Sequence, residues 1–290
     1  MSHLLITGAN GQLGNELRKL APVFSHHRFF FTDVAELDIT HPDAIEAFFA
    51  DNRINVVVNC AAYTAVDKAE SDEATALLIN ATAVQYLAQS CIRHQATLVH
   101  VSTDYVYDGQ ACTPYSENHP AAPLSAYGRT KLAGEKAALN AEKTVILRTA
   151  WLYSAFGNNF VKTMLRLGKE KEALNVVFDQ TGAPTYAADL AQCIMQVVEK
   201  DAKDELVRGI FHFSNEGVCS WYDFAREIMQ MAGLTCAVHP IESKDYPTLA
   251  ARPSYSVLNK AAVKKAYGVM IPHWRESLGK CLDELAASQS

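Results

Sequence analysis

The run Asn55-Val-Val-Val-Asn59 constrains the fold of this chain more than any other stretch. A continuous series of β-branched residues is typical of a strand that is buried on both of its faces. Strands of this kind occur in parallel sheets that carry helices on either side. The run therefore predicts an α/β protein built around a covered sheet.

Short apolar runs alternate with helical patterns on both sides of this strand. Further strands are expected at His3–Thr7, Arg28–Thr32, Thr97–Ser102 and Thr144–Leu147, and helices at Gln12–Leu20, Pro42–Asp51, Glu73–His94 and Ala126–Asn140. Strands separated by helices in this rhythm imply right-handed βαβ crossovers. The expected fold is a doubly wound, Rossmann-like parallel sheet.

The pattern loosens after Trp151. It still predicts helices at Asn159–Gly168, at Ala187–Lys200, after Ser220 and from His273, and strands at Leu174–Phe178 and Gly209–Ser214. No long linker or repeat divides the chain. We expect a dinucleotide-binding domain over residues 1–150, to which segments 157–180 and 209–232 return. Residues 151–290 would form mainly a smaller, interwoven substrate lobe.

Composition excludes several classes of protein. A net charge of −6 argues against a nucleic-acid-binding surface. The seven cysteines are scattered without CxxC spacing, which favours reduced thiols over disulfides or a zinc site. Structure is predicted to begin at His3, which leaves no room for a signal peptide, and no apolar run reaches the ~20 residues of a membrane helix. We expect a cytoplasmic protein that does not enter membranes.

A glycine-rich turn, Gly8-Ala-Asn10-Gly11-Gln12-Leu-Gly14, lies between the first predicted strand and helix. In that context glycines permit a tight turn, close approach of the backbone to a pyrophosphate, and close packing of helix on sheet. The free amides at the helix N-terminus suit phosphate groups. A plain strand–helix turn would also use glycine, so the motif needs support from its surroundings.

Two acids come after the second predicted strand. Asp33 lies about 20 residues beyond the turn, where a carboxylate can accept a hydrogen bond from a ribose 2′-hydroxyl. A 2′-phosphate would be repelled there, and no Arg or Lys occurs within the next several residues, so NADH is favoured over NADPH. A solvated loop acid is the alternative for Asp33. Asp38 is a weaker candidate for the adenine side.

Two more strand ends point to the same edge of the sheet. Asn59-Cys-Ala-Ala62-Tyr63-Thr64 offers small residues that a flat cofactor can approach, although alanines also serve ordinary packing. The strand that ends in Ser102-Thr103-Asp104 brings two hydroxyls to this edge, and only one of them can face the cofactor because side chains alternate along a strand.

The pair Tyr127 and Lys131 supplies candidate chemistry. Residues four apart share one face of a helix, so phenol and ammonium would enter the same space. An ordinary tyrosine titrates near ~10 and needs a lowered pKa to act near neutral pH. Lys131 can favour the tyrosinate and lower that pKa. Tyr127 could then protonate the alkoxide that forms when a carbonyl accepts hydride. Such a pair also occurs by chance on exposed helices.

Together these segments resemble the extended short-chain dehydrogenase/reductase superfamily and, within it, the family of dTDP-4-dehydrorhamnose reductases. The resemblance covers nearly the whole chain. It is carried by Gly8–Gly14, Ala62–Glu70, Val101–Gly109, Tyr127–Lys131, Arg148–Trp151, Gly157–Phe160, Asp179–Thr185 and Ala251–Pro253. Related sugar-nucleotide dehydratases have Thr-Asp-Glu where this chain has Thr103-Asp104-Tyr105, so the resemblance implies reduction without dehydration.

The resemblance also implies roles for single residues. It makes Thr103, Tyr127 and Lys131 the catalytic set and selects Thr103 over Ser102. Cofactor contacts would come from Gly8, Asn10, Gly11, Gln12, Gly14, Asp33, Asp38, Ile39, Ala62, Tyr63 and Thr64, with Tyr127 and Lys131. Thr103, Asp104 and Trp151 would contact a deoxysugar, and Arg252 would clamp its diphosphate. Trp151 could instead be a core aromatic, and Arg252 a surface residue.

The implied reaction is NAD(P)H-dependent reduction of the 4-keto group of dTDP-4-dehydro-L-rhamnose. Two alternatives stay open: a reductase of another nucleotide-linked 4-keto sugar, and a non-catalytic dinucleotide-binding subunit that resembles the methionine adenosyltransferase β subunit. Some members of the family form homodimers around magnesium held by glutamates. Glu16 matches one of these, but Ala188 replaces another, so no metal is expected and the dimer is in question.

Overall fold

A computed structural model describes residues 1–287 of the chain. Its centre is a six-stranded parallel sheet with the strand order β10-β5-β4-β3-β1-β2. The strands are β1 (His3–Thr7), β2 (Arg28–Phe31), β3 (Val56–Asn59), β4 (Thr97–Thr103), β5 (Thr144–Thr149) and β10 (Gly209–His212). The predicted doubly wound sheet is therefore confirmed.

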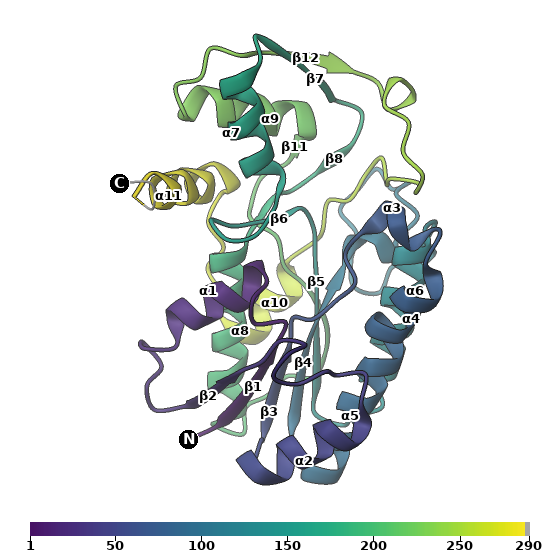
Figure 1. Cartoon of the computed structure of the whole chain (residues 1–290), viewed down its shortest axis with the longest axis vertical. Coiled ribbons are helices and arrows are strands. Elements are labelled where there is room, and N and C mark those ends of the chain that lie inside the picture. Colours follow the sequence, from purple (N-terminus) through teal and green to yellow (C-terminus); the bar gives the residue numbers. More distant parts are fainter. Residues whose placement is uncertain (288–290) are drawn as a thin grey trace.

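Helices cover both faces of this sheet (Figure 1). One face carries α1 (Gln12–Leu20), α8 (Ala187–Asp201) and α10 (Ala261–Tyr267). The other carries α2 (Pro42–Asn52), α4 (Glu73–Leu77), the π-helical turn η1 (Leu78–Thr82), α5 (Ala83–His94) and α6 (Ala126–Ala138). No helix within residues 1–287 combines the length and the apolar character that crossing a membrane requires.

Alternation along the strands builds the two cores. In β1, Leu4 and Ile6 pack into the core under α1 and α8, while Leu5 packs into the opposite core under α2 and α5. In β3, Val56 and Val58 likewise pack into the first core, while Val57 packs into the second. The β-branched run of β3 is thus fully buried on both faces, as predicted.

A second lobe lies above the carboxyl ends of these strands (Figure 1). Its helices are α7 (Phe160–Glu170), α9 (Trp221–Met231) and α11 (Trp274–Ala287). Its strands pair two by two: β6 (Leu152–Tyr153) with β9 (Thr185–Tyr186), β7 (Ala173–Val177) with β12 (Ala237–Ile241), and β8 (Thr181–Gly182) with β11 (Cys219–Ser220). Short helices α3 (Val66–Ala69), η2 (Asp104–Val106) and η3 (Ser243–Asp245) complete the chain.

Two expectations about the later segments need correction. Strand β7 was expected to return to the large sheet with segment 157–180, but it pairs with β12, which the sequence pattern did not indicate. Helix α9, in the expected returning segment 209–232, packs on α7 in the upper lobe, and only β10 of that segment joins the large sheet. The β7 pattern alternates exposed and buried residues, as suits a small sheet with one face covered.

The predicted long helix from Glu73 to His94 contains a π-helical turn. Within η1 the side chain of Asn80 is buried and meets three groups. It accepts from the Tyr63 amide at 2.8 Å and donates to the Tyr63 carbonyl at 3.2 Å and to Thr130 Oγ1 at 3.1 Å. Helix α6 crosses this turn at Gly134, where a Cβ would overlap the carbonyl oxygen of Asn80.

Candidate active site

A cleft of about 830 Å³ lies between the large sheet and the upper lobe. Its floor is formed by the carboxyl ends of β1, β3, β4 and β5. Strands β1 and β3 are neighbours at the point where the strand order reverses. From β1 the chain continues to β2 on one side, and from β3 it continues to β4 on the other side. Ligands of doubly wound sheets bind at such a switch point.

The glycine turn forms the part of the cleft next to β1. Gly8 has a φ of +61°, which favours glycine, and a Cβ there would lie 2.7 Å from the amide nitrogen of Ala61. At Gly14 a Cβ would lie 2.5 Å from Cα of Ala9, so helix α1 can pack closely only without a side chain. Gly8, Gly11 and Gln12 line the cleft.

Asp33 and Asp38 both reach the cleft after β2. The Asp33 carboxylate accepts from the Asn10 amide at 3.0 Å and from its neighbour Val34 at 2.9 Å, and so joins the second strand end to the glycine turn. Hydrogen bonds from the amide and hydroxyl of Thr40 hold the pKa of Asp38 below its usual value. Ile39 also lines the cleft.

The loop after β3 forms the next part of the wall. Ala62 and Thr64 line the cleft, but the ring of Tyr63 does not. The Tyr63 hydroxyl instead donates to Asp72 at 3.2 Å, while its backbone is held by the Asn80 side chain. Tyr63 therefore contributes to this site through the position of its backbone.

The end of β4 separates its two hydroxyls, as strand alternation predicts. Ser102 Oγ donates to Glu135 Oε1 at 2.6 Å and is committed to that buried contact. Thr103 Oγ1 donates to Asp104 Oδ1 at 2.9 Å and accepts from the Tyr105 amide at 3.2 Å. Burial raises the pKa of Asp104 to about 6, against the opposing effect of the Thr103 and Ser256 hydroxyls, and within residues 1–287 its Oδ2 has no partner at hydrogen-bond geometry.

Tyr127 lies beside these groups in the first turn of α6, behind an N-cap in which Ser125 Oγ accepts from the Gly128 amide at 3.1 Å. Its ring meets that of Tyr105 edge-on, with centroids 5.4 Å apart. Burial raises the pKa of Tyr127, and a hydrogen bond with Thr103 reduces this rise without reversing it. The lowered pKa expected from Lys131 is therefore not found within residues 1–287 without a cofactor, because no positive charge offsets the desolvation of the phenol.

Lys131 reaches the same cleft from the next turn of α6 and is only 2% exposed. Its ammonium donates to the Val101 carbonyl at 2.7 Å, and burial lowers its pKa to about 8. An ammonium carries three donors, and within the described chain only this one hydrogen bond is formed. The donors that remain are available to a ligand in the cleft, and the cofactor contact expected of Lys131 stays a prediction.

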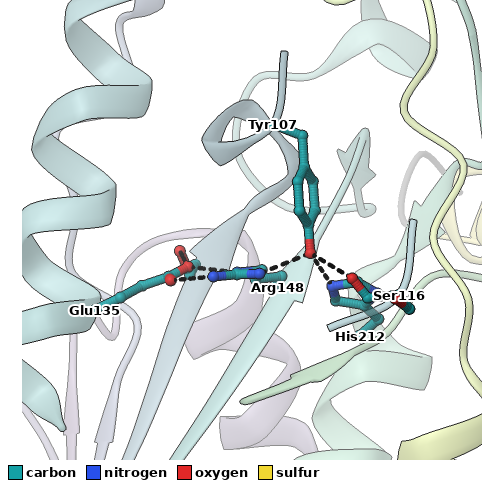
Figure 2. Close-up of polar contacts among 6 residues, drawn as sticks. Tyr107, Ser116, Glu135, Arg148 and His212 are labelled. Atoms are coloured by element: carbon teal, nitrogen blue, oxygen red, sulfur yellow. Dashed lines mark hydrogen bonds and ion pairs between the residues drawn. The ribbon is translucent and has the colours of Figure 1, made fainter. Parts of the chain in front are cut away.

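A buried ion pair supports this helix from behind (Figure 2). Glu135, one turn after Lys131, accepts from Arg148 Nε at 2.8 Å and from Arg148 Nη2 at 2.6 Å. Both side chains are nearly inaccessible, at 2% and 4% exposed. This pair was not identified from the sequence. Glu135 is four residues after Lys131 and so lies on the same face of the helix, which was the one available signal.

The network continues away from the cleft (Figure 2). Arg148 Nη1 donates to the Tyr107 hydroxyl at 2.7 Å, and that oxygen lies 2.7 Å from His212 Nε2. Burial, followed by the charge of Arg148, lowers the pKa of His212 to about 3, so this imidazole is neutral. Helix α6 and strands β4, β5 and β10 are therefore joined by the side chains of Glu135, Ser102, Arg148 and His212, with Tyr107 between the last two.

The upper lobe contributes Trp151, whose backbone has a φ of +49°. Its indole stacks on that of Trp221, with ring centroids 3.7 Å apart and planes 11° apart. Arg252 does not line the cleft itself. It donates to Asp67 at 2.6 Å, and its guanidinium lies 6.0 Å from the centre of the Tyr105 ring, which does line it.

Most of the predicted site residues are therefore brought together. The cleft is lined by Gly8, Gly11, Gln12, Asp33, Asp38, Ile39, Ala62, Thr64, Thr103, Asp104, Tyr127, Lys131 and Trp151. Asn10, Gly14, Tyr63 and Arg252 do not line it. The roles of all these residues stay predictions at this point.

The glutamate that resembles a magnesium ligand lies elsewhere. Glu16 is buried, accepts from Ser154 Oγ at 2.7 Å, and lies 3.4 Å from Lys19 Nζ. The same ammonium lies 2.5 Å from Glu284, and Ala188 offers no ligand atom. A lysine already lies between the two carboxylates, so these residues do not fit a divalent cation. A homodimer stays a prediction of the resemblance.

Among residues 1–287, the side chains of His26, His27 and Glu199 also lie close enough together to hold a metal ion. Their hydrogen bonds explain this arrangement without an ion. The Ser2 amide donates to His27 Nδ1 at 3.1 Å, which leaves the His27 proton on Nε2, and Nε2 then donates to Glu199 at 2.8 Å. Both ring nitrogens of His27 therefore have partners within the chain, and a metal ion would have to displace the proton on Nε2.

Comparisons with known proteins agree with this arrangement. The family model described as the RmlD substrate binding domain matches residues 1–287. A dTDP-4-dehydrorhamnose reductase of Aggregatibacter actinomycetemcomitans is 43% identical over 286 residues, which are 96% of this chain and 97% of the relative. A probable dTDP-4,6-dihydroxy-2-methyloxan-3-one 4-ketoreductase of Streptomyces antibioticus is 44% identical over 289 residues, 98% of this chain and 96% of the relative.

A solved structure shares both the fold and the sequence pattern. The dTDP-4-dehydrorhamnose reductase of Bacillus anthracis, crystallised in complex with NADP, is 39% identical with a TM-score of 0.93. The match covers 98% of this chain and all of that one. Fold and cleft together define an NAD(P)-dependent oxidoreductase of the short-chain dehydrogenase/reductase type. The chain belongs to the RmlD substrate binding domain family.

Proposed function

We propose that this protein reduces the 4-keto group of dTDP-4-dehydro-L-rhamnose with a reduced nicotinamide cofactor, to give dTDP-L-rhamnose. The observation that carries the proposal is the meeting of Thr103, Tyr127 and Lys131 in one cleft at the switch point of a dinucleotide-binding sheet. Relatives described as dTDP-4-dehydrorhamnose reductases match nearly the full length of the chain, which supports the same substrate here.

Each residue of the set has a distinct part in the reaction. A bound nicotinamide supplies the hydride, which forms a new C–H bond at the carbonyl carbon. Tyr127 gives its proton to the carbonyl oxygen as general acid. Its raised pKa keeps the phenol protonated until that oxygen gains charge. Thr103 orients the oxygen beside the phenol, and Lys131 holds the ribose and favours the tyrosinate that remains.

We propose that Asp104 and Trp151 bind the sugar and that Arg252 binds the diphosphate. Asp104 Oδ2 is buried and unpaired within the described chain, so a sugar hydroxyl can satisfy it. Arg252 is held at the edge of the cleft by Asp67, and its planar guanidinium suits phosphate oxygens. In line with these contacts, residues 151–290 are proposed to supply most of the substrate lobe and residues 1–150 most of the cofactor domain.

We propose that NADH is preferred and that NADPH is also accepted. Asp33 lines the adenosine end of the cleft, and its carboxylate would repel a 2′-phosphate. The Bacillus anthracis relative holds NADP, so this preference needs its own measurement. A ratio of kcat/KM below one for NADH over NADPH would refute it. Use of these reduced cofactors and the seven free thiols support a place in the cytoplasm.

The assay combines purified protein, NADH or NADPH and the dTDP-linked 4-keto sugar, and monitors nicotinamide absorbance with product identification. Tyr127→Phe should retain cofactor affinity and lose roughly 10²-fold or more in turnover, the usual worth of a positioned acid. Near-normal turnover in that variant would remove Tyr127 from the mechanism. No oxidation of either cofactor by the wild type would refute the reductase proposal.

A second candidate is reduction of another dTDP-linked 4-keto sugar. The Streptomyces antibioticus relative, a probable 4-ketoreductase of a different sugar, is as similar as the rhamnose enzymes. Competition between the two sugars for the wild-type protein decides between them, because the better substrate has the larger kcat/KM.

A further inference from the structure

Trp151 is held in a backbone conformation that bulky residues adopt only under constraint. Its φ of +49° lies in the left-handed region, and it comes directly after Ala150 at the end of β5. Its carbonyl accepts from the Thr185 amide at 3.1 Å, which fixes the backbone on one side. Strain of this kind persists where the surroundings determine it and gathers at binding sites.

The indole of Trp151 is confined by groups to which no function has been assigned. Trp221, the first residue of α9, stacks on it at 3.7 Å. Gly182 also lies against the indole, because a Cβ there would lie 2.8 Å from Cε2 of Trp151 and 2.7 Å from Ser256 Oγ. The indole therefore fits only because residue 182 has no side chain.

Trp221 itself is well anchored. The Ser220 hydroxyl accepts from the Asp223 amide at 3.1 Å, and the Asp223 carboxylate accepts from the Ser220 amide at 3.0 Å, which forms a capping box at the start of α9. The Phe160 ring, at the start of α7, packs on Trp221 with centroids 4.5 Å apart. The surface against which Trp151 rests is thus rigid and belongs to the upper lobe.

We propose that Trp221 and Gly182 are positioning residues for the substrate, which hold the strained Trp151 so that its indole forms an apolar wall of the cleft for the sugar. This inference rests on the proposed function, because it assigns the sugar of that substrate to this wall. Trp221 acts through Trp151 and does not line the cleft itself.

The test uses both binding and a spectroscopic signal. Two stacked indoles couple their electronic transitions, so the wild type should show a paired circular-dichroism band that disappears in Trp221→Leu. The same variant should raise KM for the sugar nucleotide roughly 3- to 10-fold, the worth of one aromatic stack, with the Kd for NADH unchanged. Trp221→Phe keeps an aromatic face and should restore most of the loss.

Gly182→Ala provides an independent test because it does not alter the Trp221 side chain and displaces Trp151 by a methyl group that would lie 2.8 Å from its Cε2. It should raise KM in the same way. Trp274→Phe is the matched control, since Trp274 is a buried tryptophan of the same lobe that does not line the cleft. It should leave both the paired band and KM as they are.

The outcomes separate the two proposals. A wild type that oxidises no cofactor with the sugar nucleotide overturns the proposed function and this inference with it. An active wild type whose KM stays unchanged in Trp221→Leu and in Gly182→Ala, although the paired band is lost, overturns the inference alone. An equal rise in KM in the Trp274→Phe control also overturns it, because the effect would then come from loosening of the lobe.

Discussion

The buried pair of Glu135 and Arg148 leads to a quantitative prediction about stability. Glu135→Gln keeps the shape of the side chain but removes its charge. Arg148 then stays buried with neutral partners, the Gln amide oxygen and the Tyr107 hydroxyl, and without a counter-charge. Removal of one partner from a buried ion pair costs about 3–5 kcal/mol, because the charge that remains has lost its compensation.

That cost is a large part of the total. Proteins are typically stable by about 5–15 kcal/mol, so the variant should lose about a fifth or more of its free energy of unfolding. For a chain of this size the thermal midpoint should fall on the order of 10 °C. The measurement is urea unfolding monitored by circular dichroism, with a thermal scan beside it.

A matched control lies on the same helix. Arg129, like Lys131 in α6, pairs with Glu73 at 3.1 Å, but both side chains are about half exposed, at 46% and 48%. Exposed pairs of this kind contribute at most about 1 kcal/mol, so Glu73→Gln should be nearly neutral. The double variant Glu135→Met with Arg148→Met should recover most of the loss, because it buries no charge.

The reasoning fails if Glu135→Gln and Glu73→Gln cost the same. It also fails if the double variant is less stable than Glu135→Gln, since the harm would then come from lost packing volume and not from an uncompensated charge. A loss of activity without a loss of stability in Glu135→Gln would show that Glu135 acts on the cleft and not on the fold.

Three further predictions concern the cleft. Because the pKa of Lys131 is about 8, its ammonium is lost as pH rises through that value, so kcat/KM should fall on the alkaline side, and Lys131→Arg should move the fall to higher pH in a pH–rate profile. The pKa of Asp104 rises from 3.8 to about 6 on folding, so the folded chain binds this proton more tightly than the unfolded chain does. The free energy of unfolding should therefore decrease as pH rises from about 4 to 6, by about 3 kcal/mol at most. In urea unfolding at several pH values, Asp104→Asn should remove this dependence. Gly8→Ala should weaken NADH binding and lower the thermal midpoint more than Gly268→Ala, because both glycines have positive φ but only at Gly8 does a Cβ meet neighbouring backbone, and equal effects would remove the contact with Ala61 from the explanation.

The main sheet was predictable because its signals are local. Buried parallel strands appear as short apolar runs, and β1, β3 and β4 begin and end within a residue of their predicted limits. The edge of the sheet where ligands bind could be assigned from topology alone. That is why residues as distant in sequence as Asp33 and Tyr127 could be assigned to one cleft.

The features that escaped prediction depend on contacts between distant segments. Strand β12 contains Pro240 and is largely exposed, so its sequence does not look like a strand until β7 lies beside it. The pKa of Tyr127 depends on burial by surrounding elements, which no spacing reveals. The pairing of Glu135 with Arg148 likewise appears only when α6 lies on β5.

The π-helical turn at Leu78–Thr82 makes one wall of the cleft sensitive to the number of residues in the helix, since Leu78 and Ile79 of this turn line the cleft. A π-turn accommodates one more residue than an α-helical turn does, and this residue lets Asn80 hold both backbone groups of Tyr63. Deletion of a single residue here would restore a regular helix and rotate its two halves relative to each other by about 100°. Asn80 would leave Tyr63, and the loop with Ala62 and Thr64 would lose its support. In an alignment of relatives, a one-residue gap at this point therefore marks a protein that must hold its cofactor loop by other side chains.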